Sequence, residues 1–327
     1  MNQYSTPPNK VQLSVIVLFY HGERWIQGCI QSLQEQSLAR STYEIILVDN
    51  GGSTPSVKNY EGLPHTKVLR FSKNYGFAGG NNKALAHADG KFILLMNQDV
   101  VVHFNCLEEL LNAAADTPQA GIISANMLMI STNMHIDRHA PIDNTVGLYE
   151  LSPFGYAAYT KWQVDSNLVP VDFISGNAMF FRKRMLQEAG GYLFDERLVS
   201  YAEDLDLSIR LKKTAWKMYV RPKALVFHYR DDAFSGNPAD KLRKLVHISS
   251  NRLWVYFNNL SATSFLRRLP VLLLGIPLKV ARPDGSIDFH FFPFVMASLA
   301  LPLIFTAFCV RVFADLKSKP QMQNPQN

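Results

Sequence analysis

The stretch that decides the fold is KFILLMNQDVVV, residues 91–102. Its five consecutive apolar residues end abruptly in Asn97, Gln98 and Asp99. A short apolar run with such boundaries is typical of a strand buried on both faces, as in a parallel sheet covered by helices. Ligands of such sheets bind beyond the carboxyl ends of the strands, so Asp99 is placed to bind a metal or a phosphate. Taken alone, a structural turn at Asn97 and Asp99 is the better interpretation.

Strand and helix patterns alternate on both sides of this stretch. Upstream, we expect strands at 13–20, 44–48 and 68–71 and helices at 23–36 and 76–88. Downstream, we expect strands at 121–129, 173–182, 217–220 and 224–227 and helices at 104–115, 183–189 and 203–213. The alternation predicts an α/β fold with a mostly parallel, Rossmann-like central sheet flanked by helices and right-handed crossovers. Residues 131–170 lack periodicity, which is typical of a lid or binding loop.

Composition indicates a folded protein with an anionic partner. The chain has 327 residues, of which 47% are hydrophobic, and a net charge of +6. Basic residues gather at 241–252 and 267–268, which predicts a basic surface that faces lipid headgroups or nucleic acid. No nucleic-acid motif accompanies these residues, so we expect a membrane surface and no nucleic acid.

Cysteine usage and the first residues indicate a reducing compartment. Cys29, Cys106 and Cys309 are far apart and lack the spacing of a zinc site or a disulfide framework. The first apolar run, 13–20, is too short for a signal peptide. We therefore expect the N-terminal part to stay in the cytosol.

Four polar clusters fall at predicted strand ends or at a helix start. They are Asp49-Asn50, Asn97 to Asp99, Glu203-Asp204 and His228. A doubly wound sheet can bring such positions to one edge, where they suit transfer from a nucleotide-activated donor. Asp99 and His228 could hold a divalent cation that stabilises a departing diphosphate. Asp204 could take the proton of an attacking hydroxyl.

The glycine cluster at 76–80 leaves two interpretations open. Its spacing and its place after the third strand differ from those of a dinucleotide-binding fingerprint. It could allow close approach to a phosphate at a helix N-terminus, or it could serve a tight turn and helix packing. We read Asp206 and Arg210 as an exposed helical ion pair, and His135 and His139 as solvated.

Five segments resemble a known family. They are 15–17 with 25–26, 47–53, 74–82, 95–99 and 201–207. They look like family 2 glycosyltransferases, especially the rhamnosyltransferase-like branch, and the likeness covers roughly residues 11–230. The resemblance implies a GT-A fold, a nucleotide-sugar donor and a reaction that inverts the anomeric centre.

The resemblance also implies roles for single residues. Asp204 would be the general base, Glu203 would contact the acceptor, and Asp99 with His228 would bind Mg²⁺ or Mn²⁺. The donor-binding residues would be Asp49, which contacts the nucleobase, Asn50, Asn74, Gly79, Asn97 and Asp99. The family's metal motif has two acids, or Asn-Pro-Asp in this branch, whereas Gln98 stands in the middle here. Asp99 is then the only anionic ligand that this motif supplies.

The C-terminal third has a different character. Residues 291–310 form a 20-residue run without a charged side chain, interrupted by Pro293 and Pro302. As a helix of about 30 Å it could just cross a bilayer, whereas the apolar run 269–278 is too short. The basic flanks favour an in-and-back or interfacial arrangement over a single crossing. A buried helical subdomain is the alternative.

These observations predict four regions. They are a flexible N-terminus at 1–10, a GT-A catalytic domain at 11–232, a C-terminal helical, membrane-associated region at 233–316 and a flexible tail at 317–327. The predicted enzyme moves rhamnose or a similar hexose from a dTDP- or UDP-linked donor to a saccharide or polyprenyl-linked acceptor. We expect it to serve cell-surface polysaccharide biosynthesis at the cytoplasmic face of the inner (plasma) membrane. The alternative is a non-catalytic nucleotide-sugar-binding or scaffold protein, and a homodimer is left open.

Overall fold

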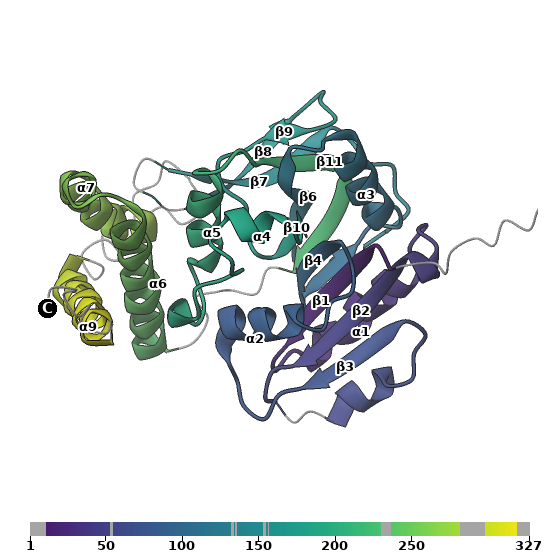
Figure 1. The fold of residues 1–327 in the computed structure, drawn as a ribbon, viewed down its shortest axis with the longest axis horizontal. Coiled ribbons are helices and arrows are strands. Elements are labelled where there is room, and N and C mark those ends of the chain that lie inside the picture. The colour runs from purple at the N-terminus through teal and green to yellow at the C-terminus, as the bar shows by residue number, and fades with distance from the viewer. Residues whose placement is uncertain are drawn as a thin grey trace, which may run out of the picture. The chain divides into compact units, whose positions relative to one another are not determined.

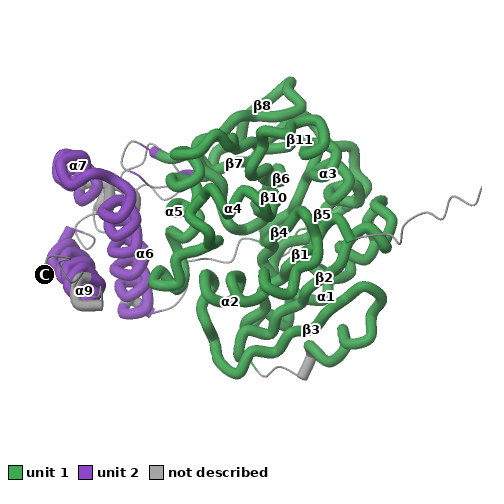
Figure 2. Tube along the Cα trace, viewed as in Figure 1, with its two compact units in different colours: residues 1–151, 159–233 green, residues 152–158, 234–327 purple. Residues whose placement is uncertain are grey.

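The computed structural model describes residues 11–52, 55–131, 134, 136–152, 155, 157–229, 237–281 and 298–318. The chain forms two compact units (Figure 2). Unit 1 contains residues 1–151 and 159–233, and unit 2 contains residues 152–158 and 234–327. The predicted flexible N-terminus, the predicted solvated His135 and residues 291–297 of the apolar run lie outside the described residues.

A mixed sheet is the centre of unit 1 (Figure 1). Its strands, in spatial order, are β3 (Thr66–Arg70), β2 (Tyr43–Asp49), β1 (Leu13–Phe19), β4 (Phe92–Asn97), β10 (Ala178–Arg182), β6 (Ala120–Ile130), β11 (Lys217–Tyr229) and β5 (Val100–Val102). A short strand, β9 (Val169–Pro170), pairs with β11. The four strands from β3 to β4 are parallel, but β10 is antiparallel to both of its neighbours and β5 is antiparallel to β11. The expected mostly parallel sheet is therefore mixed.

The 92–96 run is a central strand buried on both faces, as predicted. Leu94 and Met96 join a core that includes Val15 and Leu47. Their neighbour Leu95 belongs to a second core on the opposite face of the sheet. Because side chains of a strand alternate between faces, an unbroken apolar run supplies both cores at once.

Helices cover both faces of the sheet. The α-helices of unit 1 are α1 (Glu23–Gln34), α2 (Gly76–Leu85), α3 (Cys106–Asp116), α4 (Met185–Glu188) and α5 (Glu203–Leu211), with 3₁₀ helices η1 (Arg40–Thr42), η2 (Pro55–Tyr60) and η3 (Glu196–Leu198). Buried side chains of α1 and α3 join the first core, whereas those of α2, α4 and α5 join the second. All five α-helices lie where the apolar periodicity predicted them, with ends that differ by a few residues.

Residues 131–170 differ from the expected irregular loop. They contain β7 (Thr145–Leu151) and β8 (Ala157–Gln163), which pair as a separate two-stranded sheet, and also β9. Gly147 breaks the alternation of β7, and it approaches the main sheet so closely that a Cβ there would lie 2.0 Å from the carbonyl oxygen of Met127. The exposed end of β8, 161–163, has no buried side chains to reveal it.

Two further strands differ from their expected bounds. The run 173–182 becomes a strand only at Ala178. The runs 217–220 and 224–227 form one strand, β11, whose register shifts between Arg221 and Leu225. Pro222 lies in this irregular part and has no N–H to pair.

Unit 2 is helical. Its described helices are α6 (Pro238–Asn259), α7 (Ala262–Ala281) and α9 (Leu301–Ser318). Asn237 caps α6 by accepting a 2.9 Å hydrogen bond from the N–H of Asp240. Trp254, Phe265 and Phe308 are buried. None of the helices in the described part of the chain combines the length and the apolar character needed to cross a bilayer.

Candidate active site

A pocket of about 370 Å³ lies at the carboxyl ends of β1 and β4. It is lined by Leu18, Tyr20, Asn50, Asn74, Gly76, Phe77, Asn97, Gln98, Asp99, Ser200 and Tyr201. Four of the predicted donor-binding residues, Asn50, Asn74, Asn97 and Asp99, therefore meet at one place. The sequence patterns assigned no lining role to Tyr20 or Ser200, and none to Tyr201, although Tyr201 begins the family-like segment 201–207.

Asn50 shapes one wall of this pocket. Its Nδ2 donates to Oδ1 of Asn74 at 3.1 Å and to the carbonyl of Gly76 at 3.0 Å. Its Oδ1 accepts from the N–H of Tyr75 at 3.1 Å. The side chain thus fixes the 74–76 turn against the end of β2.

Two predicted donor-binding residues do not line the pocket. Asp49 is buried and accepts a 2.9 Å hydrogen bond from the N–H of Gly52. Gly79 is buried within α2, where a Cβ would lie 3.3 Å from Cβ of Tyr75. Their assigned roles in donor binding stay predictions.

The start of α2 is tied to another loop. The N–H of Phe77 donates to Oγ of Ser200 at 3.2 Å, and the N–H of Ala78 donates to the carbonyl of Val199 at 3.0 Å. Gly76 has a φ of +71° and lies so close to this loop that a Cβ would be 2.5 Å from the Val199 oxygen. Of the two roles left open for the glycine cluster, these contacts support the tight turn with helix packing.

The loop at 199–202 is strained. Val199, Tyr201 and Ala202 have φ values of 61°, 68° and 71°, which residues other than glycine rarely adopt. Such conformations cost roughly 1–3 kcal/mol each and persist where the surroundings fix them. Here the bonds to α2 fix the loop, which leads directly into Glu203 and Asp204 at the start of α5.

Asp204 and Glu203 differ in their surroundings. Asp204 accepts hydrogen bonds from the N–H of Gly176 at 3.2 Å and from its neighbour Leu205 at 2.8 Å. Burial raises the pKa of Asp204 to about 6, although these hydrogen bonds oppose the shift. Glu203 is 6% exposed, and its Oε2 has no hydrogen-bond partner in the described ranges. Burial, with the neighbouring Asp204 charge, raises the pKa of Glu203 well above its usual value.

These pKa shifts separate the two carboxyl groups chemically. Near pH 7, Asp204 is mostly ionised and can accept a proton. Glu203 binds its proton more tightly than an exposed glutamate, because burial and the neighbouring Asp204 charge both raise its pKa. Backbone N–H groups of Gly176 and Leu205 hold the Asp204 carboxylate, whereas Oε2 of Glu203 lacks such a partner among the described residues, and this difference favours Asp204 as the proton acceptor.

Asp99 and His228 lie side by side although they are distant in sequence. Antiparallel pairing of β5 with β11 brings them together, and the N–H of Tyr229 donates to the carbonyl of Asp99 at 3.0 Å. Nε2 of His228 is 3.3 Å from Oδ1 of Asp99. Oδ1 of Asp99 and Nδ1 of His228 are buried without a hydrogen-bond partner among the described residues.

This pair fits a divalent cation in part. One carboxylate and one imidazole leave positions for diphosphate oxygens and water, as Mg²⁺ sites at substrate phosphates usually do. No third His, Cys, Asp or Glu joins them to form a cluster within the described chain. The protein would thus supply few metal ligands. This agrees with the sequence, where the neutral Gln98 leaves Asp99 as the only anionic ligand of the motif.

Gln98 has a different partner. Its Nε2 donates to the carbonyl of Tyr20 at 3.0 Å, and its Oε1 accepts from the N–H of Tyr20 at 2.8 Å. Gly22 leaves room for this side chain, since a Cβ there would lie 2.2 Å from Cδ of Gln98. A carboxylate could accept but could not donate, so the neutral amide is required for both bonds.

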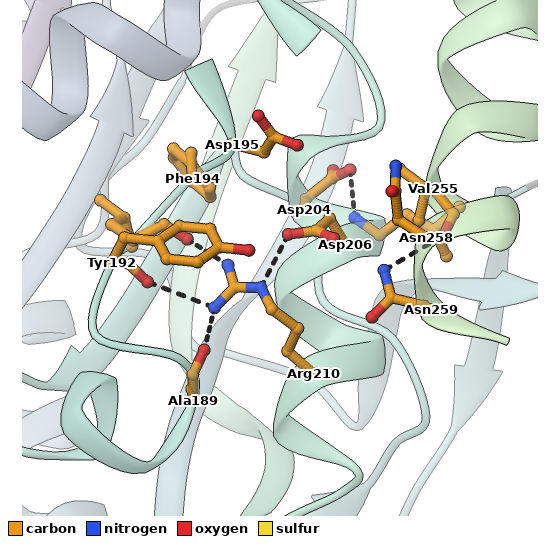
Figure 3. A network of polar contacts seen from close by, with 12 residues as sticks. Ala189, Tyr192, Phe194, Asp195, Asp204, Asp206, Arg210, Val255, Asn258 and Asn259 are labelled. Atoms are coloured by element: carbon orange, nitrogen blue, oxygen red, sulfur yellow. Dashed lines mark hydrogen bonds and ion pairs between the residues drawn. The ribbon is translucent and has the colours of Figure 1, made fainter. Parts of the chain in front are cut away.

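The Asp206–Arg210 pair anchors α5 (Figure 3). Nε of Arg210 donates to Asp206 at 2.7 Å, and its other nitrogens donate to the carbonyls of Ala189, Tyr192 and Leu193. Asp206 is 4% exposed and Arg210 is 9% exposed. The expectation of an exposed pair was wrong, because the 189–193 turn covers this side of the helix.

Comparisons with known proteins agree with this architecture. The model of the family described as glycosyl transferase family 2 matches residues 14–189, more than half of the chain. The N-acetylglucosaminyl-diphospho-decaprenol L-rhamnosyltransferase of Mycobacterium tuberculosis is 27% identical over 220 residues, which cover 61% of this chain and 70% of the relative. The family match ends before Glu203, Asp204 and His228, so the roles assigned to these three residues stay predictions.

Two solved structures share the fold. TarS residues 1–349 of S. aureus has a TM-score of 0.53 at 20% identity and covers 91% of this chain and 83% of that one. The mannosyltransferase PcManGT of Pyrobaculum calidifontis, solved with GDP-Man and Mn²⁺, has a TM-score of 0.56 at 16% identity and covers 98% and 85%. Such likeness supports a GT-A-like arrangement of the sheet and its helices. The chain belongs to glycosyl transferase family 2 and is a glycosyltransferase.

Proposed function

We propose that this enzyme transfers rhamnose or a similar hexose from a nucleotide sugar to a saccharide acceptor with inversion. The observation that carries this proposal is the convergence of Asp99 and the 200–201 loop on one pocket. That loop leads into Asp204, whose raised pKa suits a general base near neutral pH. The pocket would hold the nucleotide and sugar, and Asp204 would face the acceptor.

The chemistry assigned to Asp204 is a single displacement. Its carboxylate takes the proton of an acceptor hydroxyl while that oxygen forms a bond to the anomeric carbon. The bond from the anomeric carbon to the diphosphate oxygen breaks on the opposite face, so the configuration inverts. General-base help of this kind contributes roughly 10²- to 10⁴-fold.

Asp99 and His228 would hold Mg²⁺ or Mn²⁺. The 3.3 Å approach of Nε2 of His228 to Oδ1 of Asp99 supports this assignment, since it brings two potential metal ligands together. When bound, such a cation balances the negative charge that develops on the leaving nucleoside diphosphate. The structural neighbour PcManGT was solved with GDP-Man and Mn²⁺, which agrees with a divalent metal in this fold.

The relative from M. tuberculosis guides the choice of substrates. Its name describes rhamnosyl transfer to N-acetylglucosaminyl-diphospho-decaprenol, and TarS was solved with UDP-GlcNAc. We therefore propose a dTDP- or UDP-linked donor and a polyprenyl-linked saccharide acceptor in cell-surface polysaccharide synthesis.

Unit 2 would bind the cytoplasmic face of the membrane. Exposed Leu303, Val310 and Phe313 share one side of α9, since their spacing follows the helical repeat. Residues 234–327 contain eleven Lys and Arg but only four Asp and Glu, which favours anionic headgroups. An interfacial position of α9 needs no spanning segment.

Vesicle sedimentation tests the membrane assignment. We expect the full chain to sediment with vesicles of phosphatidylethanolamine and phosphatidylglycerol, and Leu303→Glu with Val310→Glu to remain in the supernatant. Asn112→Glu, at an exposed position of α3 in unit 1, is the control for added charge. Equal sedimentation of the double variant and the wild type would contradict the assignment.

A nucleotide-sugar panel tests the transferase assignment. Purified enzyme is incubated with Mn²⁺ and dTDP-rhamnose, UDP-GlcNAc or related donors, and release of nucleoside diphosphate is measured with and without a polyprenyl-diphosphate-linked saccharide. We expect acceptor-dependent release and an inverted product. A donor that binds without hydrolysis or transfer would support the scaffold alternative.

A further inference from the structure

A second pocket in unit 1, of about 680 Å³, has no assigned role. It lies where the β7–β8 sheet meets β9 and the segment that follows β9. We call it the hairpin pocket and define it by Tyr149, Glu150, Trp162, Gln163, residues 169–173 and Lys212. These residues come from four separate parts of the chain, so only the tertiary structure assembles them.

Trp162 is the prominent aromatic group of the hairpin pocket. It is 52% exposed, which is unusual for so large an apolar side chain. Its Nε1 donates to Oγ1 of Thr160 at 3.0 Å, and Thr160 donates to Glu150 at 3.1 Å. The polar edge of the indole is therefore held by the sheet while much of the ring surface remains accessible. A held, exposed ring is suited to stacking on the C–H face of a sugar.

The polar groups of the pocket favour a neutral ligand. The pocket is lined by two carboxylates, Glu150 and Asp172, and by one ammonium, Lys212, which contacts Asp172 at 2.7 Å. This excess of negative charge opposes binding of a phosphate or a nucleotide. Carboxylate, ammonium and amide groups together provide donors and acceptors for sugar hydroxyls. Apolar walls with a few polar groups are typical of small-molecule pockets.

Two covalent paths connect this pocket to the candidate base. Lys212 follows α5, eight residues after Asp204, which corresponds to about 12 Å along the helix. Residues 171–173 line the pocket, and the same segment continues to Gly176, whose N–H binds the Asp204 carboxylate. A saccharide chain bound at Asp204 would have to extend about 12 Å along α5 to reach the hairpin pocket.

We propose that the hairpin pocket binds further sugar residues of a neutral saccharide acceptor, beyond the residue that receives the transferred sugar. This inference rests on the transferase function proposed above. It deepens that function by giving the enzyme a preference for oligosaccharide over monosaccharide acceptors. Trp162 would supply the stacking surface, and Glu150, Gln163 and Lys212 would bind hydroxyls.

Binding to immobilised glycans tests the proposal without requiring transfer. Full-length enzyme is applied to an array of neutral, phosphorylated and uronic-acid-containing oligosaccharides. We expect binding to neutral oligosaccharides to weaken about tenfold or more in Trp162→Ala, as for a central aromatic contact, and to survive largely in Trp162→Phe. Lys161→Ala is the matched control. Lys161 is next to Trp162 on β8, but its side chain is exposed and does not line the pocket.

The outcomes separate this proposal from the transferase assignment. Unchanged binding in Trp162→Ala, no binding of the wild type to any neutral oligosaccharide, or a preference for phosphorylated glycans would overturn it. The melting temperature of each variant, with and without UDP, reports folding and donor binding. Glycan binding that depends on Trp162 in a protein without transferase activity would keep the saccharide site and refute the transferase function. Transfer by Trp162→Ala with the oligosaccharide KM of the wild type would keep the transferase function and refute the saccharide site.

Discussion

The side-chain amide of Gln98 forms two hydrogen bonds with the backbone of Tyr20, one through each of its polar atoms. The amide thereby imitates a paired strand residue and holds the end of β1 beside the end of β4. Both Gln98 and Tyr20 line the candidate donor pocket. The departure from the family's metal motif thus has a structural use, and Gln98 shapes the pocket without supplying a charge.

Gln98→Glu tests this use. A glutamate cannot donate to the Tyr20 carbonyl and places a negative charge against it, a loss of roughly 1–3 kcal/mol. We expect the donor KM to rise about 5- to 100-fold and the affinity for Mn²⁺ to gain little. Gly22→Ala should act in the same direction, because its Cβ would displace Gln98. A Gln98→Glu enzyme with tighter metal binding and unchanged donor KM would show that Gln98 faces the metal instead.

Asp204→Asn tests the general base. Since the pKa of Asp204 is about 6, we expect wild-type kcat/KM to fall about tenfold per pH unit below that value and to level off above it. Asp204→Asn should lower turnover roughly 10²-fold or more and remove this acid limb. Glu203→Gln should cost less than about tenfold, because the amide keeps the size and hydrogen-bonding capacity of the side chain while the Asp204 carboxylate remains. A dead Glu203→Gln enzyme beside an active Asp204→Asn enzyme would reverse the assignment.

Urea unfolding tests whether a loss of turnover in Asp204→Asn comes from unfolding of the variant. The folded state raises the Asp204 pKa from 3.8 to about 6, so it binds more protons than the unfolded state in that range. Ionisation of Asp204 therefore lowers the free energy of unfolding as pH rises from about 4 through 6. Asp204→Asn should be at least as stable as the wild type at pH 8, as measured by urea unfolding.

Substitutions at the Asp99–His228 pair test metal binding. Asp99→Ala removes the anionic ligand, so we expect activity to fall to background at any Mn²⁺ concentration. His228→Ala removes a ligand that water can replace, so activity should return at about tenfold higher Mn²⁺. Titration calorimetry measures the affinity for Mn²⁺ in the presence of UDP. This affinity should fall more in Asp99→Ala than in His228→Ala. Full activity of the wild type in excess chelator would rule out this site.

Arg210→Met tests the anchor of α5. The substitution leaves the buried Asp206 carboxylate without its guanidinium partner, which typically costs about 3–5 kcal/mol of unfolding free energy. Arg70→Ala breaks an exposed pair with Glu61 and should cost less than about 1 kcal/mol. Urea unfolding compares the two. Equal losses would mean that the Arg210 network contributes no more than a surface ion pair.

Apolar runs in the sequence were sufficient to predict the parallel half of the sheet and its helices. The predicted runs at 13–20, 44–48 and 92–96 are apolar enough to be buried on both faces, and this property is local. The observed strands 13–19, 43–49 and 92–97 agree with them to within one residue at each end. The same runs placed Asn50, Asn97 and Asp99 at strand ends, hence at one edge of the sheet. The site residues that follow strands were therefore predictable before their neighbours were known.

Tertiary structure decided which of these groups touch. The insertion of β10 antiparallel between β4 and β6, the separate β7–β8 sheet, and the pairing of β5 with β11 that joins Asp99 to His228 all depend on contacts between distant segments. Contacts between distant segments also bury Arg210 under the 189–193 turn and join Gln98 to Tyr20 by hydrogen bonds. Periodicity in a sequence reports whether a side chain is buried, but it does not report which distant residue covers or contacts that side chain, because that choice is made by the packing of the whole fold.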